Sequence, residues 1–399
     1  MILPNLKNVV YPDYTHSIIN FISSILSVYH VESNHPLLKE LDSNQLKEKK
    51  NIIVLIFDGL GYEYLKAIHK EEPLFIMNHL LTSLTTVTPS STPSAITSLL
   101  TGETPLEHGN LGWTLFFKEF GQYIQLLPML DYIENKSINI HKYAPMDIIK
   151  LNNIFKKIRK KDSNTLLYQI IPHLLFYSYY NYHLTYPATR ISYHSLPSFF
   201  KKIQKTARKK TVNQKLIFAY SPEPDLLFHE EGTEKEKTIR MIKQIDDSCK
   251  KLAEDLAGTD SSIFIVSDHG LVNINKTYYI NEDKALYNSL IMPTFPEKRF
   301  FSFFVKNHKR EHFEESIQKF KKDFLILPRK EFLESGLLGP GTPHYKIDDF
   351  IGDYVCIGIA DAQKDTIFDQ IGKKEFEVKA SHSGLTREEM LVPLIHIEV

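Results

Sequence analysis

The sequence predicts an α/β protein in which a mostly parallel sheet is sandwiched between helices. Three observations support this: short apolar runs rich in β-branched residues, helical spacing between two of them, and polar residues where the runs end. Runs of this kind are typical of strands that are buried on both faces. They lie at 51–57 (NIIVLIF), 215–220 (KLIFAY), 262–267 (SIFIVS) and 354–360 (YVCIGIA).

A long helix is predicted between the second and third runs. Apolar side chains recur there at helical intervals and stop shortly before Gly258, which suits a helix C-cap. We expect this helix to pack on the sheet. Its apolar stripe consists of Ile239, Ile242, Ile245, Cys249, Leu252 and Leu256.

Two regions interrupt the alternating pattern. The region 126–214 is rich in aromatic residues and lysine, and the region 275–350 contains a candidate strand at 300–305. We interpret the first as an inserted lid and the second as a small cap subdomain. The catalytic core is then expected to comprise 1–125, 215–274 and 351–399.

Composition narrows the class of protein. Lys plus Arg equals Asp plus Glu at 48 each, so there is no basic excess of the kind that non-specific nucleic-acid binding requires. Cys249 and Cys356 cannot form a disulfide framework, and the N-terminal segment lacks the pattern of a signal peptide. No run is long and apolar enough to span a membrane. We therefore expect a cytoplasmic protein, and nothing in the sequence indicates an oligomeric state.

Six potential metal ligands follow the apolar runs or lie in a turn near the C-terminus. In open α/β sheets, the carboxyl edge is where ligands bind. Carboxylates and neutral imidazoles suit Zn²⁺, with Mn²⁺ or Fe as alternatives, and six of them suffice for two sites that keep open positions for substrate. Two such ions can stabilise both the attacking and the leaving oxygen of an in-line displacement. The six residues are Asp58, Asp225, His229, Asp268, His269 and His382.

The segment 88–102 (TPSSTPSAITSLLTG) offers a nucleophile. Its hydroxyl groups lie in a Pro-punctuated turn before an apolar helical stretch. The N-terminus of a helix favours a phosphoryl anion, and a nearby metal ion lowers the pKa of a hydroxyl group. The candidate hydroxyls are Ser90, Ser91, Thr92 and Ser94.

In several fragments the sequence resembles the type I phosphodiesterase/nucleotide pyrophosphatase branch of the alkaline phosphatase superfamily. The matching fragments, in the order of the family, are IVLIFDGLG, TPSSTPSAITSLLTGETPLEHG, DLLFH, SDHG and SHSGLTREEMLVPL. They span nearly the whole chain. The resemblance implies an alkaline phosphatase-like fold and two-metal hydrolysis of a phosphodiester or pyrophosphate, with a nucleotide-like substrate, through a phosphoryl-threonine intermediate.

The resemblance also assigns roles. It implies that Thr92, ten residues before Gly102, is the nucleophile. It places one metal ion among Thr92 and three ligands, and the other among the remaining three. The first set of ligands is Asp58, Asp268 and His269, and the second is Asp225, His229 and His382.

One departure from the family pattern leaves the reaction open. Members of this branch usually carry an asparagine about twenty residues after the nucleophile to hold a phosphoryl oxygen, and Trp113 stands at the matching position. The alternatives are a phosphomonoesterase or phosphonate hydrolase with the same residues, and a non-catalytic protein that binds a phosphorylated ligand. A sulfatase is disfavoured, because that class needs a Cys or Ser nucleophile followed four residues later by Arg, where this chain has Thr92 and Ile96.

Several further residues have simpler interpretations. The basic clusters at 156–161 and 201–210 suit solvated helix faces, with a positive rim that steers an anionic substrate as the alternative. The tyrosines at 177–182 suit the interior of the lid, with stacking on a nucleobase as the alternative. We interpret His108 and His344 as loop-supporting residues and not as metal ligands.

Overall fold

The structure is a computed structural model that describes residues 3–138, 149–364 and 378–399. Within these residues, the central sheet has seven strands in the order β2-β19-β10-β1-β9-β7-β8. β19 runs antiparallel to its neighbours, and the other pairs are parallel. The predicted mostly parallel α/β sheet is therefore confirmed. Its strands are β1 (Asn51–Phe57), β2 (Leu80–Thr85), β7 (Leu166–Pro172), β8 (Thr189–Tyr193), β9 (Lys215–Ser221), β10 (Ser261–Val266) and β19 (Leu391–Glu398).

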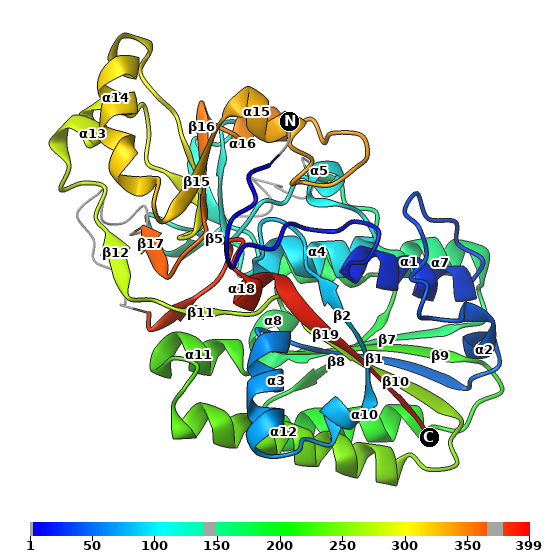
Figure 1. Ribbon diagram of the computed structural model, residues 1–399. Helices are drawn as coiled ribbons and strands as arrows, with labels where there is room; N and C mark the ends of the chain where they lie inside the picture. Colours follow the sequence, from blue (N-terminus) through cyan, green and yellow to red (C-terminus); the bar gives the residue numbers. More distant parts are fainter. Residues whose placement is uncertain (1–2, 139–148, 365–377) are drawn as a thin grey trace.

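Helices cover both faces of this sheet (Figure 1). Every residue of β1 is buried, and alternate side chains from Ile52 to Phe57 enter two different hydrophobic clusters. One cluster includes α1, α4 and α7, and the other includes α3, α10 and α12, which confirms the helix predicted before Gly258. The bounds are α1 (Ile18–Val28), α3 (Tyr62–Glu71), α4 (Thr92–Thr101), α7 (Ile154–Lys161), α10 (Leu196–Ala207) and α12 (Glu236–Asp255).

The region 126–214, expected as an inserted lid, is in large part central sheet. β7 and β8 are strands of that sheet, and α10 packs on it. The physical reason is the run LLYQIIP of β7, which is buried at its five inner positions and pairs in parallel with β9. Aromatic and basic residues on both sides of this run obscured it in the sequence. The short helices α8 (His173–Phe176) and α9 (Tyr179–Thr185) lie between the two strands along the chain.

A second, antiparallel sheet forms the cap, in the order β13-β14-β16-β15 (Figure 1). β14 (Phe300–Phe303) matches the candidate strand at 300–305, but β16 (Tyr354–Gly358), expected in the core, belongs to the cap. Every residue of β16 is buried, so its run looks like that of a parallel core strand. The other cap elements are β13 (Phe295–Pro296), β15 (Phe324–Pro328), α13 (Lys284–Ser289), α14 (Arg310–Ser316), α15 (Arg329–Glu334) and α16 (Ile347–Phe350).

Small sheets connect the cap to the core. The antiparallel sheet β3-β4-β5-β6 packs against the cap through β3 and β13. β11 pairs with β18, and this pairing carries the chain from 381 onward to the carboxyl edge of the central sheet. The strands are β3 (Thr114–Phe117), β4 (Gln122–Gln125), β5 (Leu130–Asp131), β6 (Lys136–Ser137), β11 (Val272–Asn273), β12 (Lys276–Tyr278), β17 (Ala362–Lys364) and β18 (Ala380–Ser381). Among the described residues, no helix combines the length and the apolar character that crossing a membrane requires.

Candidate active site

The carboxyl edge of the central sheet gathers polar residues from three adjacent strands. Asp58 directly follows β1, Asp268 and His269 follow β10, and Asp225 begins α11 (Asp225–Glu231) after β9. Because β10, β1 and β9 are parallel neighbours, their carboxyl ends meet at one edge. His382 reaches the same place from the turn after β18. All six ligand candidates therefore lie at one edge of the sheet.

Asp58, Asp268 and His269 form a group that we name the inner triad. Each offers one ligand atom, and these atoms all lie within 4.8 Å of one another. The three side chains are at most 4% exposed. Oδ1 of Asp268 accepts hydrogen bonds from the backbone N–H groups of Gly59 (3.1 Å) and His269 (3.0 Å), and the Tyr220 hydroxyl donates to Asp58. These bonds fix the orientation of both carboxylates.

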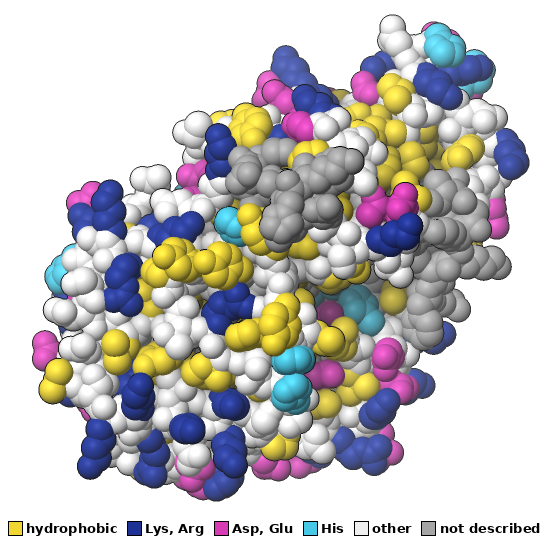
Figure 2. Space-filling model, turned by 180° about the vertical axis from the view of Figure 1, so that it is seen from behind, with side chains coloured by type: hydrophobic (Ala, Val, Ile, Leu, Met, Phe, Trp, Pro, Cys, Tyr) yellow, Lys and Arg dark blue, Asp and Glu magenta, His cyan; other side chains and the backbone are white. Residues whose placement is uncertain are grey.

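Asp225, His229 and His382 form a second group, the outer triad, whose ligand atoms also lie within 4.8 Å of one another. Asp225 and His229 are four residues apart on α11, which brings Nε2 of the histidine to 3.3 Å from Oδ2 of the aspartate. The His229 side chain is 26% exposed, unlike the fully buried imidazole of the inner triad. Figure 2 shows histidine and acidic side chains together in a hollow of the surface.

The three histidines of the two triads are held by the same kind of hydrogen bond. The Nδ1 atom of each lies at hydrogen-bonding distance from a backbone carbonyl, so Nδ1 carries the proton and donates it to that bond. Nε2 is then left with its lone pair, as a metal ligand requires, and the carbonyl bond holds the ring. The acceptors are Ala380 O for His229 (2.7 Å), Gly270 O for His269 (3.1 Å) and Ser90 O for His382 (3.2 Å).

The residues of both triads fit divalent cations. Nε2 lies 3.3 Å from a carboxylate oxygen in the pair His229–Asp225 and also in the pair His269–Asp58, so in each pair two electron-rich atoms face each other and a proton or a metal cation shared between them is favourable. Among the described residues, Oδ1 of Asp225 and Oδ2 of Asp268 are buried without a hydrogen-bond partner. Burial, together with the charges of Asp268 and Asp225, raises the pKa of Asp58 well above its ordinary value. Cations at the two triads would remove all of these penalties.

Thr92 is the hydroxyl residue that faces the inner triad. It is the first residue of α4, and its Oγ1 lies 3.1 Å from Nε2 of His269 and 3.4 Å from Oδ1 of Asp58. The side chain is buried but lines the same pocket as the outer triad. A phosphoryl group bound in that pocket would therefore meet the Thr92 oxygen at the N-terminus of a helix, where anions are stabilised.

Two of the three neighbouring serines donate their hydroxyl groups to backbone carbonyls. Oγ of Ser90 donates to the carbonyl of Gly384 at 2.7 Å, and Oγ of Ser94 donates to the carbonyl of Asn110 at 2.8 Å. Ser91 is the N-cap residue of α4, and its buried hydroxyl has no hydrogen-bond partner among the described residues. The geometry therefore favours Thr92 over the three alternatives.

A buried ion pair holds the turn that carries His382. Arg299, which directly precedes β14, donates to Glu389 of α18 (Arg387–Met390) from Nε (2.7 Å) and from Nη2 (2.8 Å), and both side chains are fully buried. The same carboxylate accepts from the backbone N–H of Gly384 at 2.7 Å. Ser383 adopts a positive φ of 92°, an unfavourable conformation that this clamp helps to hold. The cap and the core thus fix the outer triad together.

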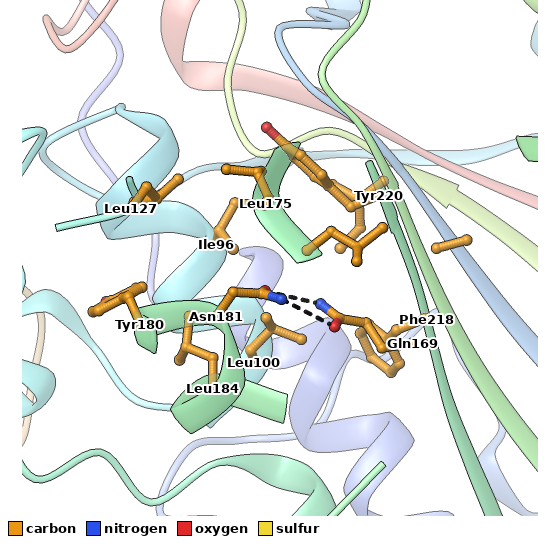
Figure 3. Close-up of a pocket in the computed structure, with 13 residues that line it drawn as sticks. Ile96, Leu100, Leu127, Gln169, Leu175, Tyr180, Asn181, Leu184, Phe218 and Tyr220 are labelled. Atoms are coloured by element: carbon orange, nitrogen blue, oxygen red, sulfur yellow. Dashed lines mark hydrogen bonds between the residues drawn. The ribbon is translucent and has the colours of Figure 1, made fainter. Parts of the chain in front are cut away.

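Apolar packing supports α4, the helix that begins at Thr92. Figure 3 shows a narrow cavity between α4, β7, β9, α8 and α9, in which Gln169 and Asn181 form two reciprocal amide hydrogen bonds of 3.1 and 3.3 Å. Tyr220, at the end of β9, lines this cavity and bonds Asp58 through its hydroxyl group. Sequence reasoning missed Tyr220, although the rule that polar groups at strand ends point to a site also applies to the last residue of KLIFAY. It also missed Arg299 and Glu389, which carry no local signal.

His108 and His344, the two histidines predicted to support loops, lie outside the triads. His108 is fully buried, lies 3.0 Å from the Ser98 hydroxyl and accepts from the backbone N–H of Asn110 at 3.0 Å. His344 lies 3.1 Å from the carbonyl of Ile149. Burial lowers the pKa of His108 to about 3, so its ring stays neutral. These contacts agree with a loop-supporting role.

A pocket of about 500 Å³ opens beside Thr92 and the outer triad. Its lining combines Thr92 and the outer triad with apolar side chains and with residues of the cap. Trp113, at the position that the resemblance assigns to an asparagine, is one of the wall residues. The other lining residues are Thr114, Gln125, Tyr132, Leu226, Pro296, Glu297, Lys298, Val378 and Ser381.

The fold and this site define a member of the alkaline phosphatase superfamily. The sequence matches the model of the type I phosphodiesterase/nucleotide pyrophosphatase family over residues 52–363. The chain therefore belongs to that family. Membership supports phosphoester hydrolysis, and members of the family generally use two divalent metal ions. A comparison with curated protein sequences finds no significant match.

Solved structures share the fold at low sequence identity. An inactive threonine-to-alanine variant of murine ectonucleotide pyrophosphatase/phosphodiesterase 5, in complex with AMP, superimposes with a TM-score of 0.63 at 17% identity over 87% of each chain. Phosphonoacetate hydrolase from Sinorhizobium meliloti, in complex with phosphonoacetate, gives a TM-score of 0.62 at 14% identity, covering 87% of this chain and 90% of the other. Both are similar to this chain in architecture.

Proposed function

We propose that this protein hydrolyses a phosphodiester or pyrophosphate bond of a nucleotide-like substrate through a phosphoryl-threonine intermediate at Thr92. The observation that carries the proposal is the position of Thr92 Oγ1, 3.1 Å from His269 and in the same pocket as the outer triad. Family membership and the AMP bound to the murine relative support the choice of reaction and substrate class.

The two triads would hold two divalent ions, with Zn²⁺ as the expected metal. Asp58, Asp268 and His269 would bind one ion, and the outer triad would bind the other. Ions at these positions would neutralise the phosphoryl charge and lower the pKa of the attacking hydroxyl. The chain itself fixes the geometry before substrate arrives, because backbone N–H groups orient Asp268, the Tyr220 hydroxyl orients Asp58, and backbone carbonyls orient the three imidazoles.

The proposed reaction has two displacements at phosphorus. In the first, Thr92 Oγ1 attacks in line and gives up its proton to solvent, and the leaving oxygen departs on the opposite side with its own substituent, while the other substituent stays on phosphorus. In the second, water attacks the phosphoryl-threonine and releases the threonine oxygen. The N-terminus of α4 stabilises the negative charge of the phosphoryl group in both displacements.

A phosphomonoesterase or a phosphonate hydrolase with the same residues is the second candidate. The observation that favours it is Trp113, since a bulky indole with a single N–H donor stands where the family asparagine offers an amide NH2 to a phosphoryl oxygen. The two candidates separate in a turnover assay with purified, metal-loaded protein. We expect bis(4-nitrophenyl) phosphate to be cleaved with a higher kcat/KM than 4-nitrophenyl phosphate, and the reverse order would select the second candidate.

A further inference from the structure

Trp113 lines the pocket that also contains the outer triad. This residue is the sole tryptophan of the chain, and its side chain remains 37% exposed where it lines the pocket. Leu226, which follows Asp225 on α11, lines the same pocket and is 53% exposed. Large apolar side chains on a rigid pocket wall are typical of sites that receive an apolar or aromatic group. Pro296 and Val378 extend this apolar lining.

The loop that carries Trp113 is fixed to the cap. The backbone N–H of Trp113 donates to Oε1 of Glu297 at 2.6 Å. Gly112 has a φ of 150°, and a Cβ atom there would lie 2.7 Å from Cγ of Glu297, so a larger residue would push the loop away. The backbone that carries the indole is therefore held in place. A ring held in this way loses little conformational entropy when it stacks on a ligand.

Asn110, three residues earlier, does not replace the family asparagine. Its side chain is fully buried, and its Nδ2 donates to Tyr180 OH (2.6 Å) and to the carbonyl of Pro93 (3.1 Å). Its Oδ1 accepts from the backbone N–H of Gly112 at 3.3 Å. The side-chain amide of Asn110 therefore makes its hydrogen bonds within the protein and does not serve a ligand. Position 113 offers an aromatic surface where the family pattern has a polar asparagine.

We propose that Trp113 is a specificity-determining residue, on which a planar aromatic group esterified to the substrate phosphorus stacks. This inference rests on the proposed function, because it places the phosphorus beside Thr92. The aromatic group then lies between the indole and Leu226. Among the described residues that line the pocket, Lys298 is the one cationic side chain, and it adds attraction for the anionic part of the ligand. Flat aryl or nucleobase esters are favoured over alkyl esters of equal charge.

The sole tryptophan allows a binding test that needs no turnover. Metal-loaded protein is titrated with phenyl phosphate and with methyl phosphate, and indole fluorescence is recorded. Affinities of the variants Trp113→Ala and Trp113→Phe are measured by calorimetry, with Tyr279→Ala as the control. Tyr279 is 44% exposed, similar to Trp113, and does not line the pocket.

We expect phenyl phosphate to quench the fluorescence and to bind about tenfold more tightly than methyl phosphate, given the usual energy of stacking on an aromatic side chain. Trp113→Ala should reduce this ratio to near one, Trp113→Phe should keep part of it, and Tyr279→Ala should leave it unchanged. An unchanged ratio in Trp113→Ala, or a wild-type ratio near one, would overturn the inference. Quenching by phenyl phosphate in a protein that hydrolyses no ester would support the inference and overturn only the proposed function.

Discussion

The inner and outer triads use the same ligand types but differ in how they are built. The inner triad comes from the ends of two adjacent parallel strands, and its side chains are at most 4% exposed. The outer triad combines the start of a short helix with a turn near the C-terminus, and it faces the pocket. The inner triad therefore depends on the central sheet alone, whereas the outer triad depends also on the cap. We expect a tightly held inner ion and a more exchangeable outer ion.

Replacing Thr92, the proposed nucleophile, should have the largest effect on kcat. Metal content should not change, because Thr92 belongs to neither triad. Thr92→Ala is expected to lower kcat by about three orders of magnitude or more while metal content stays at the wild-type level. Thr92→Ser should keep substantial activity, since it supplies the same oxygen without the methyl group that restricts χ1. Steady-state kinetics and metal analysis of both variants provide the measurement. A Thr92→Ala protein with near wild-type kcat and an inactive Ser91→Ala protein would move the nucleophile by one residue.

Loss of a ligand should distinguish the triads. Asp268→Ala removes a carboxylate that also accepts two backbone hydrogen bonds, so we expect loss of the inner ion, loss of activity and a lower Tm. His382→Ala should abolish the outer ion and activity with a smaller change in Tm. Elemental analysis and thermal unfolding measure both effects. Full metal content and turnover in either variant would exclude that residue as a ligand.

Chelation should separate the two ions without mutation. When a chelator is titrated into the metal-loaded protein, we expect the outer ion to leave first, because the His229 side chain is 26% exposed and the inner triad is closed to solvent. Metal content should therefore fall in two steps, and activity should be lost in the first. Simultaneous loss of both ions would show that the triads do not differ in this way.

The Arg299–Glu389 clamp should affect the outer triad more than the inner one. Glu389→Gln leaves the Arg299 charge buried without its partner, which is expected to cost about 3–5 kcal/mol in the free energy of unfolding. Replacing both residues, as in Arg299→Met/Glu389→Leu, should recover part of this loss. Denaturant unfolding gives the stability, and metal analysis should show weaker outer-ion binding. Equal weakening of both ions would contradict a specific role in holding His382.

The smallest effect is expected from the basic cluster at 201–210. Lys201, Lys202 and Lys205 are exposed on α10, which starts at the carboxyl edge after β8 and runs back toward the opposite edge. The cluster therefore lies away from the triads, and charges separated by more than about 8 Å are screened at physiological salt. Neutralising the three lysines should change kcat/KM less than about twofold. A much larger decrease at low salt that disappears at high salt would restore the alternative of substrate steering.

The sequence was most informative where potential metal ligands lie at the ends of strands. The α/β class, the family and the convergence of six ligand candidates could all be predicted, because parallel strands bring their carboxyl ends to one edge whatever lies between them. The domain boundaries could not be predicted, because the buried runs of β7 and β16 look alike in the sequence. β7 belongs to the central sheet, whereas β16 belongs to the cap. The clamp and the glutamate behind Trp113 depend on contacts between residues far apart in sequence. The cytoplasmic location stays a prediction.

The central claim, that Thr92 forms a covalent phosphoryl intermediate beside the inner triad, is tested most directly by trapping that intermediate. Metal-loaded protein is mixed with a phosphodiester substrate and quenched in acid within one turnover, and the phosphorylated residue is located by peptide mass spectrometry. We predict that Thr92, and none of Ser90, Ser91 or Ser94, carries a phosphoryl group that still bears the uncleaved ester substituent, with no modified peptide from Thr92→Ala. The same adduct on one of the serines, or rapid turnover with no modified peptide at any quench time, would contradict the account.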